Sequence, residues 1–330
     1  MHSLYRGKHF LTTQDWSKEE LEMIFSLAAR LKQERASGQY HDHILRAKTL
    51  FMIFFDNSTR TRNSFEAGIT QLGGHAHDLT PDKLQISHGE SAKDTAKVLS
   101  RFGDAIAIRY CVYGEGNKYM REMAENSSVP VLNMQCDVYH PFQILADYLT
   151  IRERFGSNTR GLKLVVSWTS APKYVRPISV PQSLILMMPR FGIDVTLAHP
   201  KEFVLMPEIV DQAKKNAEEA GARFEIVDDM EYAFRDADVV IPKSWGPLVH
   251  TQDKQEGVNL ISKYPKWTCD SRMMGLAKKH AVYMHPLPAD RGFEVSDEVI
   301  DGPQSVVFDE AENRLHVQKA LMALVMGGRP

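Results

Sequence analysis

Cysteine is scarce in this sequence, and the few cysteines fit no metal-binding spacing. The chain of 330 residues contains three, Cys111, Cys136 and Cys269. An odd number of widely spaced cysteines does not favour a disulfide framework, and none of them follows the CxxC spacing of a zinc site. We therefore expect reduced thiols and a cytoplasmic location.

Long apolar segments are missing as well. No uninterrupted apolar run reaches the length of about 20 residues that a membrane-spanning helix needs. Residues 1–15 contain no apolar core of the kind that a secretory signal peptide has. We expect no membrane partner.

Neither sign of charge is in excess. The formal net charge is -2, with 40 Lys and Arg against 42 Asp and Glu, so nucleic acid is not an expected partner. His75, His77 and His88 are joined by no carboxylate or cysteine at metal-ligand spacing, so we expect no metal.

Two glycine-rich nucleotide motifs are absent. The sequence has no GxxxxGK[ST], which disfavours a P-loop NTPase. No GxGxxG follows an expected strand, so a dinucleotide-binding fold lacks its fingerprint. A nucleotide-dependent dehydrogenase is thus a weaker alternative, which a cofactor absorbance scan would test.

What the sequence does contain is an alternation of strand and helix patterns. Single cores stop growing at roughly 250–300 residues, so the length favours two domains. In the first half the expected strands are 49–55, 104–109 and 129–133, and the expected helices are 17–35, 60–72, 91–102 and 141–154. Two tandem series of this kind predict an α/β protein with mostly parallel sheets flanked by helices.

Residues 156–161 form the best linker candidate, because they combine two glycines with Ser, Asn and Thr. After it the expected strands are 162–168, 194–198, 223–227, 238–241, 281–285 and a stretch near 305–308, and the expected helices are 182–190, 207–220 and 310–326. We therefore predict one domain over 1–155 and a second over 156–308. The last helix, 309–326, is expected to pack back on the first domain.

The most informative segment is the turn between the strand at 49–55 and the next helix. Ser58, Thr59 and Thr61 supply hydroxyl groups, and Arg60 supplies a planar fork suited to phosphate oxygens. The free amides and the dipole of a helix start add partial positive charge. The pattern predicts an anion cradle, and the alternative is a capped helix with surface arginines.

Four ordered motifs resemble those of the aspartate/ornithine carbamoyltransferase family, and the resemblance covers almost the whole chain. Ser58-Thr59-Arg60-Thr61-Arg62 resembles its carbamoyl phosphate loop, and His140-Pro141-Phe142-Gln143 its HPxQ motif. His285-Pro286-Leu287-Pro288 resembles its HxLP motif. The segment 309–316, Asp-Glu-Ala-Glu-Asn-Arg-Leu-His, resembles the closing signature of its ornithine-type branch.

The resemblance implies a role for each matching residue. Arg109 would reach the phosphate and carbonyl oxygens, and His140 would bond the carbamoyl carbonyl. The residues that would hold the phosphate are Ser58, Thr59, Arg60 and Thr61. Gln143 and the backbone carbonyl of Leu287 would take the carbamoyl NH2 group. The implied carbamoyl phosphate set is Ser58, Thr59, Arg60, Thr61, Gln85, Arg109, His140, Gln143, His285, Pro286, Leu287 and Arg314.

Within that set the resemblance implies catalytic roles for Arg60, Arg109, His140, Gln143 and Arg314. Gln85 lies in a loop that in relatives enters a neighbour's active site, so a homotrimer with shared sites is implied. The phosphate can itself accept the amine proton, so no cofactor is expected. Each residue also has a structural alternative, such as helix entry for His140 and surface pairing for Arg109 or Arg314.

The second half departs from the ornithine enzymes, whose DGNN and DxxxSMG segments are replaced by 167–173 and 242–247. Lys243-Ser244-Trp245-Gly246 resembles the knotted branch of N-acetylornithine and N-succinylornithine carbamoyltransferases, and the closest likeness is to unassigned knotted transcarbamylases. The acetylornithine enzymes carry Glu where this chain has Gln135. These differences imply second-substrate roles for Gln135, Lys243, Trp168 and Trp245.

The charge change at Lys243 suggests that its ammonium meets a carboxylate of the acceptor. Trp168 and Trp245 would form an apolar wall, with plain packing as the alternative. The prolines at 172, 177 and 181 resemble the loop through which the knotted chain is threaded. A deep trefoil knot in the second domain is therefore expected, and a stiff Pro-rich loop is the alternative.

The resemblance implies transfer of a carbamoyl group from carbamoyl phosphate to the amine of an ornithine-like or related amino acid. The sequence does not rank ornithine, N-acetylornithine, N-succinylornithine and putrescine as acceptors. Two alternatives stay open: an N-acetylornithine-specific enzyme, and a catalytically weak regulatory or ligand-binding paralogue.

Overall fold

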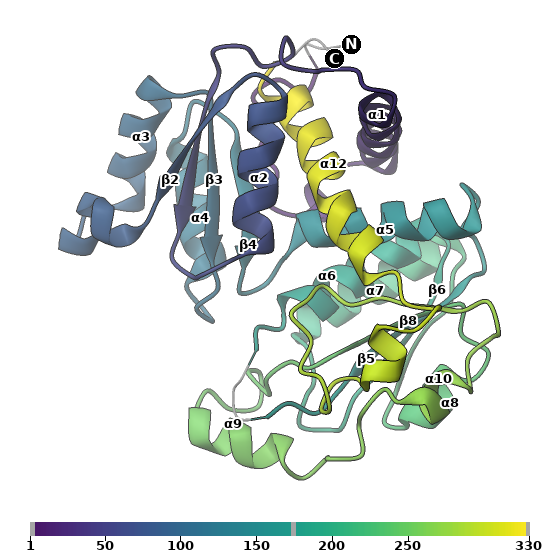
Figure 1. The fold of residues 1–330 in the computed structure, drawn as a ribbon. Helices are drawn as coiled ribbons and strands as arrows, with labels where there is room; N and C mark the ends of the chain where they lie inside the picture. The colour runs from purple at the N-terminus through teal and green to yellow at the C-terminus, as the bar shows by residue number, and fades with distance from the viewer. Residues whose placement is uncertain (1–3, 173–175, 328–330) are drawn as a thin grey trace. The chain divides into compact units, whose positions relative to one another are not determined.

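The computed structural model describes residues 4–172 and 176–327, and its contacts divide the chain into two compact units (Figure 1). The first unit comprises Met1–Ala146 with Glu312–Pro330, and the second comprises Asp147–Ala311. The boundary expected from the sequence lies at 155/156.

The first unit is built on a four-stranded sheet in the order β2-β1-β3-β4, with every neighbouring pair parallel. Helices flank this sheet, as a parallel sheet requires (Figure 1). The strands are β1 Thr49–Phe54, β2 His75–Leu79, β3 Ala105–Tyr110 and β4 Val131–Cys136. The helices are α1 Lys18–Ala36, α2 Arg60–Gln71, α3 Ala92–Phe102 and α4 Gly116–Asn126, with short 3-10 turns at Thr13–Asp15, Pro81–Lys83 and Gln85–His88.

Local sequence explains why these elements begin where they do. Ser17 caps α1 in a reciprocal capping box with Glu20, and Ser91 caps α3 by accepting a hydrogen bond from the Asp94 amide. Five of the six residues of β1 are buried, which is typical of an inner strand of a parallel sheet.

The second unit is built on a five-stranded parallel sheet in the order β7-β6-β5-β8-β9. Its strands are β5 Lys163–Trp168, β6 Asp194–Ala198, β7 Phe224–Val227, β8 Val239–Lys243 and β9 Val282–Tyr283. Its helices are α6 Ser179–Met187, α7 Pro207–Ala220, α8 Met230–Phe234, α9 Lys254–Ile261, α10 Ser271–Met274 and α11 Asp297–Ile300, with a 3-10 turn at Met188–Phe191. Helices α5 Pro141–Phe155 and α12 Val307–Val325 contribute residues to both units.

Alternate residues of the second sheet face different helices. Val165 of β5 and Val240 of β8 pack in one buried cluster with α8 and α10, which cover one face of the sheet (Figure 1). Helices α6 and α7 lie on the other face (Figure 1). Both faces are therefore covered, and the strands read as continuous apolar runs.

The predicted fold class, two parallel sheets flanked by helices, is confirmed. One predicted strand, near 305–308, is wrong: Ser305 makes only an isolated bridge to Tyr283, and α12 already begins at Val307. The expected knot involves 173–175, which lie outside the described residues, and it stays a prediction.

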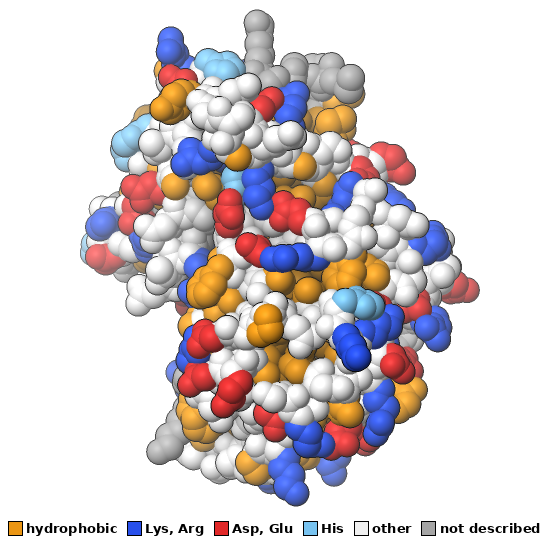
Figure 2. Space-filling view, turned by 45° about the vertical axis from the view of Figure 1, so that its right-hand side comes forward, with side chains coloured by type: hydrophobic (Ala, Val, Ile, Leu, Met, Phe, Trp, Pro, Cys, Tyr) orange, Lys and Arg blue, Asp and Glu red, His pale blue; other side chains and the backbone are white. Residues whose placement is uncertain are grey.

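Two expectations from composition concern the surface. Among the described residues, no helix is long and apolar enough to cross a membrane. On the face shown in Figure 2, acidic and basic side chains are interspersed. This agrees with the balanced charge of the sequence.

Candidate active site

The phosphate loop of the sequence analysis lies at the carboxyl end of β1, where α2 begins at Arg60. The Ser58 hydroxyl accepts a hydrogen bond from the Thr61 amide at 3.2 Å, which shapes the first turn of α2. Thr59 is exposed, and Ser58 and Arg60 are partly buried. Ligands of parallel sheets bind beyond the carboxyl ends of strands, and this loop occupies that position.

Arg314 joins two other predicted residues, Thr61 and Gln143, although the three are far apart in sequence. Its guanidinium donates one hydrogen bond to the Thr61 hydroxyl and one to the Gln143 side-chain carbonyl, both at 2.6 Å. Arg314 and Thr61 are each 2% exposed and Gln143 is 1% exposed. Helix α12 thus supplies a cation to residues of α2 and α5 within the first unit.

Arg109 lies near the end of β3, and its backbone is tied to the same loop. The Phe55 amide donates to the Arg109 carbonyl at 2.9 Å, and the Cys111 amide donates to the Asp56 carboxylate at 2.8 Å. The Arg109 guanidinium donates to the Gln135 side-chain carbonyl at 2.5 Å. The structure therefore brings Gln135, which the sequence associated with the second substrate, to a carbamoyl phosphate residue.

His140 precedes α5 and is 4% exposed. Its carbonyl accepts hydrogen bonds from the amides of Gln143 at 3.1 Å and of Ile144 at 3.4 Å, so it forms the entry to the helix. The helix-entry alternative therefore holds for its backbone. Its imidazole is the part that the family resemblance assigns to the carbamoyl group.

Arg62 and Gln85 are placed differently. Arg62, the last residue of the loop motif, forms an ion pair with Asp78 and its guanidinium lies 4.1 Å from the centre of the Phe54 ring. Gln85 is exposed, and its side-chain carbonyl lies 3.1 Å from Nδ1 of His88. Gln85 is not brought together with the other predicted residues within the chain.

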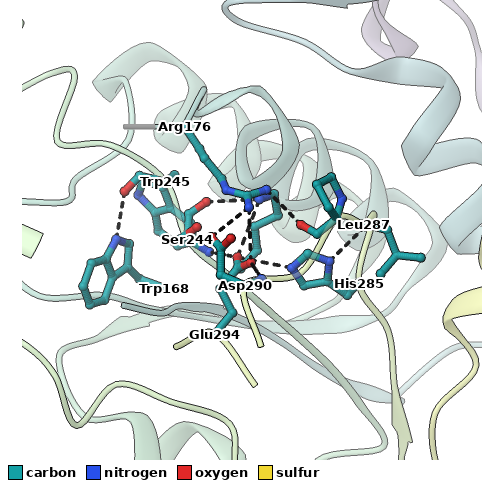
Figure 3. Close-up of polar contacts among 10 residues, drawn as sticks. Trp168, Arg176, Ser244, Trp245, His285, Leu287, Asp290 and Glu294 are labelled. Atoms are coloured by element: carbon teal, nitrogen blue, oxygen red, sulfur yellow. Dashed lines mark hydrogen bonds and ion pairs between the residues drawn. The ribbon is translucent and has the colours of Figure 1, made fainter. Parts of the chain in front are cut away.

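The second unit contains a buried polar cluster around Glu294 (Figure 3). Its carboxylate, with no exposed surface, accepts hydrogen bonds from the amides of Ser244 at 2.6 Å and Asp290 at 2.7 Å. Nζ of Lys243 lies 3.7 Å from the carboxylate and Nε2 of His285 lies 3.2 Å from it. Burial alone would raise the pKa of Glu294, but Lys243 and then His285 lower it well below its usual value.

Arg176 is the second cation of this cluster (Figure 3). It donates to the Asp290 carboxylate at 2.8 Å and to the Pro288 carbonyl at 2.9 Å, and it lies 3.7 Å from Glu294. Two cations, Lys243 and Arg176, are thus matched by two carboxylates. Burial lowers the pKa of Lys243 to about 8, against the opposing effect of Glu294.

The HxLP residues border the same cluster. His285 has no exposed surface, and burial lowers its pKa below the usual value, which favours the neutral imidazole. Its Nδ1 accepts a hydrogen bond from the Leu287 amide at 2.9 Å, and its own amide donates to Glu310 at 2.8 Å. Leu287 has a φ of 50°, a left-handed conformation that is rare for leucine. Pro286, between them, is buried.

The two predicted tryptophans are core residues. Trp168 and Trp245 have no exposed surface. The indole N–H of Trp168 donates to the Trp245 carbonyl at 2.9 Å, and that of Trp245 donates to the Phe203 carbonyl at 2.8 Å. These positions favour the packing alternative over an apolar wall.

Sequence reasoning missed Glu294, Arg176 and Asp290. They lie in segments without a motif, and their partners are distant: Arg176 and Asp290 are 114 positions apart. The only available signal was the charge of Lys243, which needs a carboxylate if it is buried. No group of three or more His, Cys, Asp or Glu side chains could hold a metal in the part of the chain that the structure describes.

Comparison with known proteins gives the family of this chain. The model of the aspartate/ornithine carbamoyltransferase carbamoyl-phosphate binding domain matches residues 8–153, and that of the Asp/Orn binding domain matches residues 177–325. An ornithine carbamoyltransferase of Caldicellulosiruptor saccharolyticus is 41% identical over 98% of this chain and 99% of its own length. The putative carbamoyltransferase YgeW of Escherichia coli is 37% identical over 96% of this chain and 89% of its own.

Solved structures give the same result. The ornithine carbamoyltransferase of Pyrococcus furiosus superposes with a TM-score of 0.89, at 39% identity over 98% of this chain and 99% of that one. An acetylornithine transcarbamylase in complex with acetylcitrulline superposes with a TM-score of 0.88, at 35% identity over 96% of this chain and 98% of that one. The chain therefore belongs to the aspartate/ornithine carbamoyltransferase family, as its motifs predicted.

Proposed function

We propose that this protein transfers the carbamoyl group of carbamoyl phosphate to the amine of an ornithine-like amino acid and releases phosphate. The observation that carries the proposal is the bridge from Arg314 to Thr61 and Gln143 beside the phosphate loop. A buried guanidinium that links a loop hydroxyl to a side-chain amide is suited to a ligand with phosphate at one end and an amide at the other.

The first unit supplies the groups that the reaction requires. The amine nitrogen attacks the carbamoyl carbon, the bond from that carbon to the phosphate oxygen breaks, and the amine proton passes to the departing phosphate. Negative charge that develops on the carbonyl oxygen is stabilised by donors from Arg109, His140 and Thr61. The loop residues Ser58, Thr59 and Arg60 hold the phosphate, and Gln143 takes the carbamoyl NH2 group.

The second unit binds the acceptor. Lys243 is one of the residues that distinguish it from the ornithine enzymes, and its ammonium is paired with Glu294 at 3.7 Å. Because the cluster of Lys243, Arg176, Asp290 and Glu294 is neutral as a whole, it suits an acceptor whose own charges cancel or are blocked. The similarity to an acetylornithine transcarbamylase supports N-acetylornithine as one acceptor to test.

Assembly and location complete the proposal. Exposure of Gln85 within the chain is what a residue that serves a neighbouring subunit requires, so a cytoplasmic homotrimer with shared sites is part of the proposed function.

The test is an assay for ureido products with carbamoyl phosphate and a panel of ornithine, N-acetylornithine, N-succinylornithine and putrescine. Arg60→Met should reduce kcat/KM for carbamoyl phosphate about 100-fold or more, since it removes a charge at the phosphate. Arg62→Met is the matched control, because Arg62 pairs with Asp78, and it should change kcat/KM less than about threefold. Absence of ureido product with every amine, together with no binding of carbamoyl phosphate, would contradict the proposal.

A further inference from the structure

The ladder between β3 and β4 contains an irregularity next to the phosphate loop. Ile108 pairs with Asn133, but the next residue, Arg109, pairs with Gln135, so Met134 is an extra residue in β4. In an unbroken ladder Met134 would stand opposite Arg109. Bulges re-aim side chains and are common beside active sites, and this one places Gln135 opposite Arg109.

Gln135 uses this position to bind the Arg109 guanidinium. Its side-chain carbonyl accepts a hydrogen bond from Nη1 of Arg109 at 2.5 Å, and Gln135 is only 6% exposed. Nε of Arg109 is buried and has no hydrogen-bond partner. Gln135 is thus the side chain that fixes the guanidinium, while the Phe55 amide fixes the Arg109 backbone at 2.9 Å.

The side chain that binds Arg109 is uncharged, although carboxylates lie nearby. Asp56 accepts from the Cys111 amide, and Asp137 accepts from the amides of Gly114 at 2.8 Å and Asn117 at 2.7 Å. Within residues 4–172 and 176–327, Arg109 forms no ion pair. Its charge is therefore held in place but not cancelled, whereas a carboxylate at 135 would cancel it.

We infer that Gln135 is a positioning residue for carbamoyl phosphate: it orients Arg109 and leaves the full positive charge of Arg109 to the phosphate. This inference rests on the proposed function, and it replaces the role in acceptor binding that the sequence suggested for Gln135. It predicts that position 135 controls the affinity for the anionic substrate and not for the amine.

The experiment compares Gln135→Glu, Gln135→Met and the exposed control Gln212→Glu with the unmodified protein. Gln135→Glu should raise KM for carbamoyl phosphate about tenfold, with a parallel weakening of inhibition by inorganic phosphate and an acceptor KM within about twofold. Gln135→Met keeps the charge of Arg109 but frees its guanidinium, so its KM should rise less, about threefold. Gln212→Glu should leave all three constants unchanged.

Each result has a definite meaning. An unchanged KM for carbamoyl phosphate in both variants at position 135 would overturn the inference, and so would a rise confined to the acceptor KM. If Gln135→Glu does not fold by circular dichroism, Gln135→Met and its phosphate inhibition decide the question alone. Failure of the unmodified protein to form any ureido product would instead contradict the proposed function, which separates the two claims.

Discussion

The two candidate substrate-binding regions hold positive charge in opposite ways. In the first unit Arg109 donates to Gln135, and Arg314 donates to Thr61 and Gln143, all of which are neutral. In the second unit Lys243 and Arg176 lie beside the carboxylates of Glu294 and Asp290. Neutral partners orient a cation and leave its charge for an anionic ligand. Carboxylate partners cancel the charge of the cation, and the resulting ion pair stabilises the fold.

This comparison gives a rule for reading similar sites. A cation that is oriented by amides and hydroxyls is suited to binding an anion, since the ligand can offset the cost of desolvating the charge. A buried cation that is matched by a carboxylate marks a scaffold. Under the proposed function, the first unit binds the dianionic substrate and the second binds an acceptor with little net charge.

The largest effect is expected at Glu294. Glu294→Ala leaves Lys243 buried without its counterion and removes the acceptor of two amide hydrogen bonds, so we expect a loss of about 3–5 kcal/mol in the free energy of unfolding. Urea unfolding followed by fluorescence of the four tryptophans, which include the buried Trp168 and Trp245, measures it.

The double variant Glu294→Ala/Lys243→Met sharpens this test. Because it removes both charges, it should be more stable than Glu294→Ala alone. Glu218→Ala, on the exposed side of α7, is the control and should change the free energy of unfolding by less than about 0.5 kcal/mol. A double variant no more stable than the single one would mean that charge pairing does not hold the cluster together.

The next effect is expected at Arg314. Arg314→Met removes the donor to Thr61 and Gln143 and the charge beside the loop, so kcat/KM for carbamoyl phosphate should fall about 100-fold. Stability should change less than in Glu294→Ala, since Thr61 and Gln143, which lose these two hydrogen bonds, are neutral. Steady-state kinetics and urea unfolding on the same samples measure both, and a loss of stability larger than that of Glu294→Ala would remove the distinction between the units.

The smallest effect concerns Lys319, a buried cation of the first unit that lies 3.2 Å from Nδ1 of His41. Burial lowers its pKa to about 8 from the usual 10.5. Between these two values the unfolded chain binds more protons than the folded one, so stability should rise as pH increases from about 8 to about 10.5.

The difference between the pH–stability curves of the unmodified protein and Lys319→Met isolates the contribution of Lys319. Lys319→Met should lose the rise in stability that belongs to Lys319, so its curve against pH should be flatter than that of the unmodified protein. Other groups titrate equally in both proteins and cancel in the difference. Two parallel curves would show that Lys319 does not keep a lowered pKa in the folded state.

Much of the fold was predictable because inner parallel strands are continuous apolar runs. The strand Asp194–Ala198 and the helix Pro207–Ala220 lie at the predicted positions. Strand β2, His75–Leu79, was missed because it lies at the sheet edge with no fully buried residue, so it lacks an apolar signal. The apolar run at 305–308 was interpreted as a strand, since short apolar runs do not distinguish a strand from a helix start.

The site was predictable where its chemistry lies in short motifs. The loop residues, Gln143 and Arg314 follow patterns in the sequence, and the structure brings Thr61, Gln143 and Arg314 together. The partners of Lys243 and Arg109 were not predictable. Glu294 reaches Lys243 through tertiary packing, and Gln135 reaches Arg109 through a one-residue bulge, which no local pattern encodes.

The pairing of Lys243 with Glu294 also constrains how this branch can change during evolution. Loss of Glu294 leaves the Lys243 ammonium in a medium of low polarity, whereas loss of Lys243 leaves Glu294 with Arg176 at 3.7 Å and His285 at 3.2 Å. The lysine is therefore the easier of the two to replace, and we expect the acidic residue to be lost only together with it or after it. Chains that share the lysine but lack an acidic residue at 294 should carry a compensating anion elsewhere in the same pocket.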